Sequence, residues 1–271
     1  MTKYTRDNIY SDMLKRVIVR CDFYEITDIE RFIDNPDNKS FLFNYFEKRI
    51  PIEQKHCEIF LNSSSEDNNG LFPVSKKTQK KVFHYEGFKL QKIDAVLDIS
   101  TDFFCLNINC KDDYRGSRIF TELMVGLIIR LKKSEPFTYF KRVGIRKIDI
   151  QILNNRNSIS DFFNDKFLVG VSWKSPIKKE SSTMTEIIKK GAVSFNVIQR
   201  VDRTSDNRRR LIYDVDGYIT KEYIEKSIKN NKLMKCLDSE IQNAMFDLFI
   251  SVTSEKFLDK CLLAKEKMSN G

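Results

Sequence analysis

Runs of alternating apolar and polar side chains constrain this chain most, because they commit a large part of it to strands. Residues 91–99 alternate in this way, and residues 80–85, 91–99 and 103–110 predict three successive strands. Alternation with a period of two is typical of a strand that buries one face. The residues between the last two runs, Ser-Thr-Asp, favour a tight turn. The pattern therefore predicts an antiparallel meander.

Further strands are expected on both sides of this meander. Residues 15–23 and 140–153 carry the same alternation. Residues 193–198 and 211–219 predict a hairpin whose connecting loop lies at 202–207. Residues 62–70 contain mostly Ser, Asn and Asp, which pack poorly, and they predict a loop.

Helical segments separate and close these strands. Residues 26–33 and 40–50 favour helices, and Pro51 is expected to end the second one. Apolar residues recur at helical spacing through 119–131, which predicts a long amphipathic helix lying across the sheet. Residues 237–252 predict another helix, and Thr253 is expected to cap a last one.

These elements predict an α+β fold in which antiparallel sheets are packed by a long central helix and closed by a C-terminal helical pair. Residues 1–136 are expected to form an N-terminal α+β half. Residues 137–271 are expected to hold the basic hairpin region and the C-terminal helices, and the two parts to form one compact unit. A chain of 271 residues with 41% hydrophobic content can bury a substantial core. We expect no internal repeat.

The sequence predicts a cytoplasmic bacterial protein that does not contact a membrane. No apolar stretch approaches the roughly 20 residues needed to cross a bilayer. Residues 1–7 lack the apolar core of a secretory signal.

The six cysteines include no C-x-x-C pair and are expected to be reduced core residues. Cys105 and Cys110 are five positions apart in one predicted strand, so they fall on opposite faces and should not form a disulfide. His56 and Cys57 are adjacent, but His84 is the only other histidine, which argues against a zinc site.

Positive charge is concentrated in the middle of the chain. The whole protein carries a net charge of +9. Residues 136–210 hold 16 Lys and Arg against 7 Asp and Glu, a local charge of +9. Such a segment is typical of a surface that binds a polyanion. An ordinary lysine-rich surface without such a partner is the alternative, and composition leaves both open.

The candidate binding residues lie in this basic segment. Arg142, Gly144 and Arg146 share one face of a predicted strand, with the arginines roughly 13 Å apart at about 3.3 Å per residue. The gap at the glycine could admit a phosphate or carboxylate. Alternatively, both arginines pair with carboxylates such as Asp94 or Asp98. The full set of expected anion- or nucleic-acid-binding residues is Arg142, Arg146, Lys147, Arg200, Arg203, Arg208, Arg209 and Arg210.

The strand motif Arg142-x-Gly144-Ile145-Arg146-x-Ile148-Asp149 resembles that of a sporadically distributed bacterial family without an assigned activity. The closing helix at 241–253 is also similar to that family's C-terminus. The family's motif has tyrosine and asparagine where this chain has Lys147 and Asp149. The resemblance implies a gene of the kind found among defence systems and mobile elements.

Several classes of enzyme are excluded by missing motifs. The chain has no Walker A or dinucleotide-binding loop and no nucleophile elbow. Asp214 and Asp216 do not fit an EF-hand, because Ile212 and Tyr223 would occupy its first and twelfth positions. Asp94 and Asp98 share a strand face, with Asp102 just beyond. They could bind a divalent metal, so a metal-dependent phosphoesterase or nuclease stays an alternative.

We therefore expect a non-enzymatic binding subunit, associated with defence if the resemblance holds, and we expect no cofactor. Its basic face would recognise nucleic acid, a phosphorylated ligand or a protein partner. A protein-interaction scaffold with incidental positive charge is a further alternative. The sequence does not fix the oligomeric state.

Overall fold

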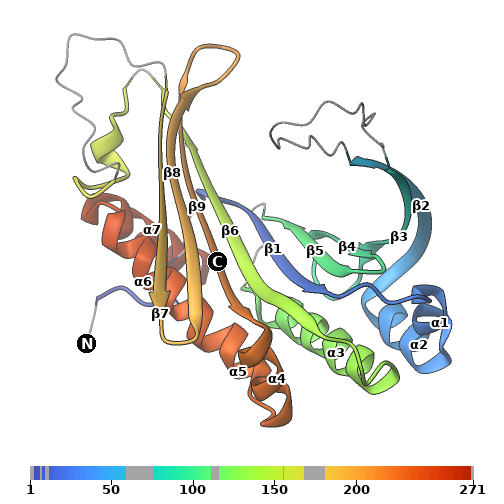
Figure 1. Cartoon of the computed structure of the whole chain (residues 1–271). Coiled ribbons are helices and arrows are strands. Elements are labelled where there is room, and N and C mark those ends of the chain that lie inside the picture. Colours follow the sequence, from blue (N-terminus) through green and yellow to red (C-terminus); the bar gives the residue numbers. More distant parts are fainter. Residues whose placement is uncertain are drawn as a thin grey trace, which may run out of the picture.

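A computed structural model describes residues 3–6, 8–9, 12–58, 76–110, 116–154, 156–167 and 181–269. For residues 51–58, 76–80 and 263–269 it describes the backbone alone. One antiparallel sheet of nine strands runs through the molecule in the order β2-β3-β4-β5-β1-β6-β9-β8-β7 (Figure 1). The strands are β1 Leu14–Phe23, β2 Phe46–Glu58, β3 Lys76–Phe88, β4 Asp94–Ile99, β5 Phe103–Asn109, β6 Phe140–Ile152, β7 Ser182–Lys190, β8 Val193–Arg203 and β9 Arg209–Thr220.

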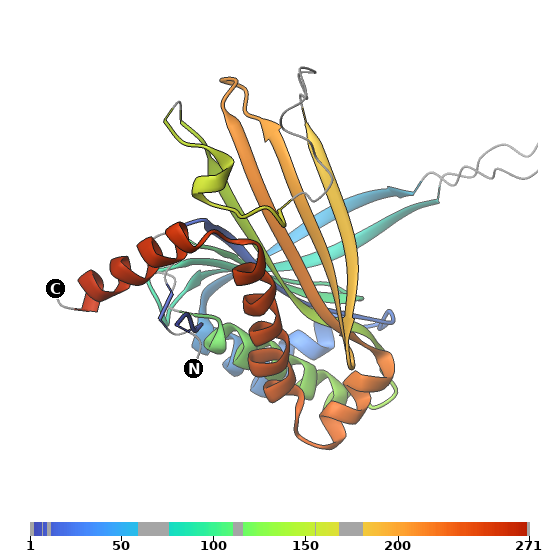
Figure 2. The ribbon, with the colours of Figure 1, turned by 90° about the vertical axis from the view of Figure 1, so that its left-hand side faces the viewer.

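The helices gather on one side of this sheet. Helix α3 packs on β1 and β5, α4 packs on β6 and β9, η2 packs on β6, and α6 packs on β9. Figure 2 shows the helices on one side, with the β6–β9 half of the sheet rising away from them. The helical elements are α1 Ile29–Asp34, α2 Pro36–Tyr45, α3 Arg118–Ser134, η1 Ile159–Asp161, α4 Lys221–Lys229, α5 Leu233–Lys235, the π-helical turn η2 Cys236–Ile241, α6 Gln242–Val252 and α7 Glu255–Ser269. Among the described residues, none of these helices is long and apolar enough to cross a membrane.

Alternation along the strands explains which side the helices cover. On β1, Val17, Val19 and Cys21 are fully buried, and on β6 Val143 and Ile145 are as well. These side chains form one core with the apolar face of α3. Because successive residues of a strand point to opposite faces, the residues between them point to the side away from the helices. We call that side the open face.

The two halves of the chain follow the same path. Each begins with a central strand, β1 or β6, continues at an outer edge of the sheet, and returns to the centre through antiparallel strands. Each then continues into helices, α3 or α4–α6, on the same side. A pseudo-two-fold axis therefore passes between β1 and β6. The likeness is one of topology, and the halves differ in length, since the first contains β1–β5 and the second β6–β9.

Most of the predicted elements are confirmed. The meander forms as β3, β4 and β5, the early strand as β1, and the basic hairpin as β8 and β9. A large antiparallel sheet combined with helices agrees with the α+β class. A single long central helix is not shown, because α3 shares the sheet with α4 and α6. Residue 136 lies between α3 and β6, and the sheet continues across it through the pairing of β1 with β6.

The predicted helix at 40–50 was wrong in its second half. Helix α2 ends at Tyr45, and Phe46 begins β2. Phe46 is fully buried against the rings of Tyr85 and Phe88 on β3. This long-range packing outweighs the local helical pattern. Pro51 does not end a helix but lies within β2, an outermost strand of the described sheet, where a missing N–H is tolerated.

The start of the last helix also differs from the prediction. Ser254, not Thr253, caps α7, since its hydroxyl accepts a hydrogen bond from the Phe257 amide at 3.3 Å. The Thr253 hydroxyl instead donates to the Phe249 carbonyl at the end of α6. The predicted loop at 62–70 lies outside the described residues.

Helix α3 allows a direct test of this packing. Ile128 is 0% exposed and its neighbour Ile129 is 48% exposed. Ile128→Ala should lower the free energy of unfolding by about 2–5 kcal/mol, because it leaves a cavity in the core. Ile129→Ala makes the same chemical change on the exposed side and should cost about 1 kcal/mol or less. Urea unfolding measures both, and equal losses would contradict the placement of α3.

Candidate functional site

The two central strands place four arginines on the open face. Arg16 and Arg20 come from β1, and Arg142 and Arg146 from β6. Each pair belongs to the pattern R-V-x-[VI]-R, which occurs at 16–20 and again at 142–146. We call these four residues the arginine seam.

Strand register sets the seam's geometry. The cross-strand pairs on the open face are Asp22 with Arg142, Arg20 with Gly144, Ile18 with Arg146, and Arg16 with Ile148. Each pair contains one arginine, and the arginines alternate between the two strands. Consecutive pairs are two residues apart, or about 6.7 Å, so the seam extends about 20 Å along the sheet.

Arg146 is held by a carboxylate on β9. Its Nε donates to Asp214 Oδ1 at 2.8 Å and its Nη2 to Asp214 Oδ2 at 2.6 Å. This two-pronged contact with Asp214 raises the pKa of Arg146. The Arg146 side chain is still 43% exposed. Its direction is fixed, and its Nη1 group has no partner among the described residues.

Arg142 is held by a carboxylate and a ring. Its Nη2 donates to Asp216, and its guanidinium lies 4.1 Å from the centre of the Tyr218 ring. Gly144, paired with Tyr218, allows β9 to approach closely. A Cβ at position 144 would lie 2.4 Å from the Gly217 carbonyl oxygen and 2.6 Å from Tyr218 Cβ. The space beside this glycine is thus filled by β9, and the predicted gap for a phosphate was wrong.

The predicted partners of the two arginines were also wrong. Both pair with carboxylates on a neighbouring strand, but that strand is β9 and not β4, which carries Asp94 and Asp98. In the sheet, β5 and β1 lie between β4 and β6. Asp98 instead contacts His84 Nδ1 at 2.8 Å, and Asp94 accepts from Asn109 at 3.4 Å.

Arg16 and Arg20 complete the seam and were not among the predicted site residues. Arg20 donates from Nε to Asp22 at 2.8 Å, lies over the Phe103 ring at 4.7 Å, and is 47% exposed. Arg16 is exposed and has no side-chain partner within the described part of the chain. The repeated R-V-x-[VI]-R pattern is the sequence signal that could have indicated them.

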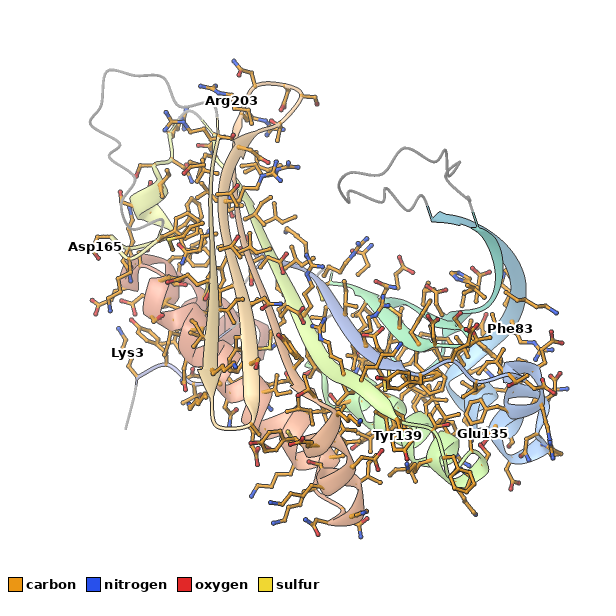
Figure 3. The ribbon with its side chains drawn as sticks, in the orientation of Figure 1. Lys3, Phe83, Glu135, Tyr139, Asp165 and Arg203 are labelled. Carbon is orange, nitrogen blue, oxygen red and sulfur yellow. The ribbon has the colours of Figure 1, made fainter. Side chains whose placement is uncertain are left out.

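The arginines of the β8–β9 hairpin do not form one cluster. Arg200 and Arg210 lie on the open face and share Asp202, with closest contacts of 2.8 Å. These contacts lower the pKa of Asp202 below its usual range, and the hydrogen bond from Arg210 makes the largest contribution. The remaining three lie elsewhere: Arg208 pairs with Asp206 in the turn, and Arg203 and Arg209 follow the opposite alternation, towards the helix side. Figure 3 shows Arg203 at the tip of the hairpin.

Lys147 is misplaced as a predicted anion-binding residue. It points to the helix side of β6, together with Asp149 two positions later. Burial lowers the pKa of Lys147 to about 8 and raises the pKa of Asp149 to about 7. A ligand on the open face would not reach either side chain.

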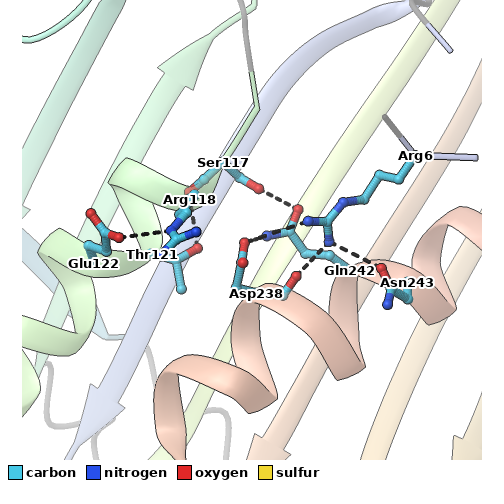
Figure 4. A network of polar contacts seen from close by, with 8 residues as sticks. All are labelled: Arg6, Ser117, Arg118, Thr121, Glu122, Asp238, Gln242 and Asn243. Carbon is cyan, nitrogen blue, oxygen red and sulfur yellow. Dashed lines mark hydrogen bonds and ion pairs between the residues drawn. The ribbon is translucent and has the colours of Figure 1, made fainter. Parts of the chain in front are cut away.

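A polar network closes the helix side near this pair (Figure 4). Arg6 Nη1 donates to the Asp238 carbonyl at 2.5 Å and to Asn243 at 3.2 Å. Ser117, at the start of α3, donates to the buried Gln242 of α6. These contacts join the N-terminal segment, α3 and the C-terminal helices. Within this network the contact between Ser117 and Gln242 is buried, whereas those of Arg6 are part-buried or exposed.

The described residues include no group of three or more His, Cys, Asp or Glu side chains that could hold a metal ion. Asp94, Asp98 and Asp102 form no such group, and the side chains of His56 and Cys57 lie outside the described part. Cys105 and Cys110 are free thiols, as predicted, on the open and helix faces respectively.

Compared with known proteins, the chain matches no protein-family model, no curated sequence and no solved structure. Membership of the family suggested by the strand motif stays a prediction. The assignment of the arginine seam as a candidate site depends on its geometry alone.

Gly144→Ala tests the close contact between β6 and β9. The new methyl group should force the strands apart and lower the free energy of unfolding by about 1–3 kcal/mol. Thr185→Ala, on an exposed position of β7, removes atoms without crowding and should cost about 1 kcal/mol or less. Thermal unfolding compares the two. A Gly144→Ala protein as stable as the parent would contradict the close approach.

The buried carboxyl of Asp149 predicts a pH dependence of stability. Its pKa is raised from 3.8 to about 7 in the folded protein. The contribution of Asp149 to the free energy of unfolding is therefore complete below about pH 4, and it is lost as the pH rises through 7. From pH 4 to 7 this group should lower the free energy of unfolding by at most about 1.4 kcal/mol per pH unit.

Asp149→Asn should flatten that slope in urea titrations, whereas Asp165→Asn, at an exposed position, should leave it as in the parent. An unchanged slope in Asp149→Asn would show that Asp149 is not the buried acid.

Proposed function

We propose that this chain is a binding protein that holds an anionic partner on its open face, with the arginine seam as the main contact. The observation that carries the proposal is the seam itself. Arginines from both halves of the chain meet in one line on the central strands. The proposal keeps the expected binding role and the expected residues Arg142 and Arg146, adds Arg16 and Arg20 of β1, and leaves out Lys147 and the tip of the β8–β9 hairpin.

The use of arginine supports recognition over mere solubility. The chain contains 31 lysines and 16 arginines. From Arg142 onward on β6, and along β5, β1, β9 and β8, the described open face carries Arg16, Arg20, Arg142, Arg146, Arg200 and Arg210, and no lysine; Lys141 lies at the bulge beside Phe140. Lysine would serve solubility equally well. Arginine adds a planar fork that binds phosphate or carboxylate oxygens in pairs.

The neighbouring carboxylates decide how strong the attraction is. Asp22, Asp214 and Asp216 neutralise much of the positive charge beside the seam. The remaining attraction comes from exposed N–H donors whose directions are already fixed. Such a site favours close contacts over a diffuse field, so its affinity should be moderate and sensitive to geometry.

The enzymatic alternative lacks a comparable observation, since the described carboxylates form no metal-binding group. A role in a defence system rests on the resemblance of the strand motif alone.

Retention on immobilised heparin, a general polyanion, tests the proposal. Arg16→Gln with Arg20→Gln removes two seam charges and should lower the salt concentration at which the protein elutes. Arg118→Gln with Arg156→Gln removes two exposed charges, one on α3 and one in the segment after β6, and should elute close to the parent. Equal shifts in both double variants would mean that net charge, and not the seam, binds polyanions. Thermal unfolding confirms that each variant folds.

A further inference from the structure

We propose, resting on the function above, that the anionic partner is single-stranded nucleic acid whose phosphodiester backbone lies along the arginine seam. Three features of the open face support this choice: the single line of cations, guanidinium groups that lie over rings, and amide side chains beside the seam.

The single line of cations favours one strand over a duplex. A duplex presents two lines of phosphates separated by a groove, and so needs two lines of cations. On both sides of the seam itself, the described open face carries carboxylates, while Arg200 and Arg210 lie beyond the Arg146 end of the seam and share Asp202. Asp214 and Asp216 lie on β9, one strand from β6, and Asp94 and Asp98 lie on β4, two strands from β1. These groups would repel a second phosphate backbone.

Two seam arginines lie over aromatic rings. Arg20 lies 4.7 Å from the centre of the Phe103 ring, and Arg142 lies 4.1 Å from that of Tyr218. Both are partly exposed, at 47% and 33%. A guanidinium plane with one face on a ring can receive an unstacked base on its other face. Single strands offer such bases, whereas an acidic peptide does not.

Amide side chains beside the seam can pair with base edges. Asn107 and Asn109 lie on the open face of β5, next to β1, and Asn196 lies farther away, on β8 beyond β9. An amide offers a donor and an acceptor, as base edges do. The nearby carboxylates Asp214 and Asp216 can accept from base amino groups, which the carboxylate side chains of an acidic peptide do not offer. The face therefore suits a ligand of mixed polarity attached to a line of negative charge.

The seam's length sets the size of the site. At about 20 Å it can contact about four phosphates, the lower end of the range for single-strand-binding domains. Four contacts predict that the logarithm of the affinity falls with the logarithm of the salt concentration with a slope of about −3.

Fluorescence anisotropy with a labelled 12-nucleotide single strand of mixed sequence tests the inference, with the corresponding duplex and polyglutamate as competitors. The single strand should bind, and both competitors should displace it less well than the unlabelled strand. Arg16→Gln with Arg20→Gln should weaken binding at least about tenfold and reduce the salt slope by about 1.4. Arg118→Gln with Arg156→Gln should bind like the parent.

Arg16→Lys with Arg20→Lys keeps the charge and removes the planar groups, so it should also weaken binding several-fold. Binding equal to the parent would overturn the stacked arrangement on which the choice of nucleic acid rests. Stronger competition by the duplex or by polyglutamate would overturn the inference and leave the proposed anion-binding function intact. If the parent protein bound neither the single strand, the duplex nor polyglutamate, both this inference and the proposed anion-binding function would be overturned.

Discussion

The antiparallel pairing of β1 with β6 is the contact on which the rest of this structure depends. It joins two half-sheets that would otherwise each expose a long central strand edge, a site prone to aggregation. Its register aligns Val17, Val19, Val143 and Ile145 with the helix side. A slip of one residue would turn the valines outward and the arginines into the core, so burial of the apolar face fixes the seam on the open face.

Charge is handled differently on the two faces of the same strand. On the open face of β6, Arg142 and Arg146 are partly exposed to water and each pairs with a carboxylate. Both conditions stabilise the charged form of arginine. On the helix face, Lys147 and Asp149 lose water, and their pKa values shift towards the neutral forms. A full positive charge therefore has little desolvation cost on the open face of β6, where it is also available to a partner. On the helix face the same charge would lose its water.

How much the sequence could predict depends on the range of the interaction. Alternation located β1, β4, β5, β6 and the β8–β9 hairpin, because it is a local consequence of one-sided burial. The local pattern gave the wrong structure at Phe46, which begins a strand because β2 pairs with β3, about forty residues further along the chain. It placed Arg142 and Arg146 on one face correctly but chose the wrong carboxylates, because only strand order puts Asp214 beside them. Arg16 and Arg20 could be recognised as site residues only after the pairing of β1 with β6 was known, because that pairing places them beside Arg142 and Arg146.

The pseudo-symmetry of the seam is broken in a way that bears on binding. Gly144 occupies the place that Ile18 has in the other half, and it lets Tyr218 and Asp216 hold Arg142 in position. Its counterpart Arg16 has no partner among the described residues, so it must lose side-chain freedom when a ligand binds. Arg142, Arg146 and Arg20 are thus held in position before a ligand binds, while Arg16 adapts to the ligand. A ligand should first meet the fixed guanidinium groups of Arg142 and Arg146, and Arg16 should become ordered only in the complex.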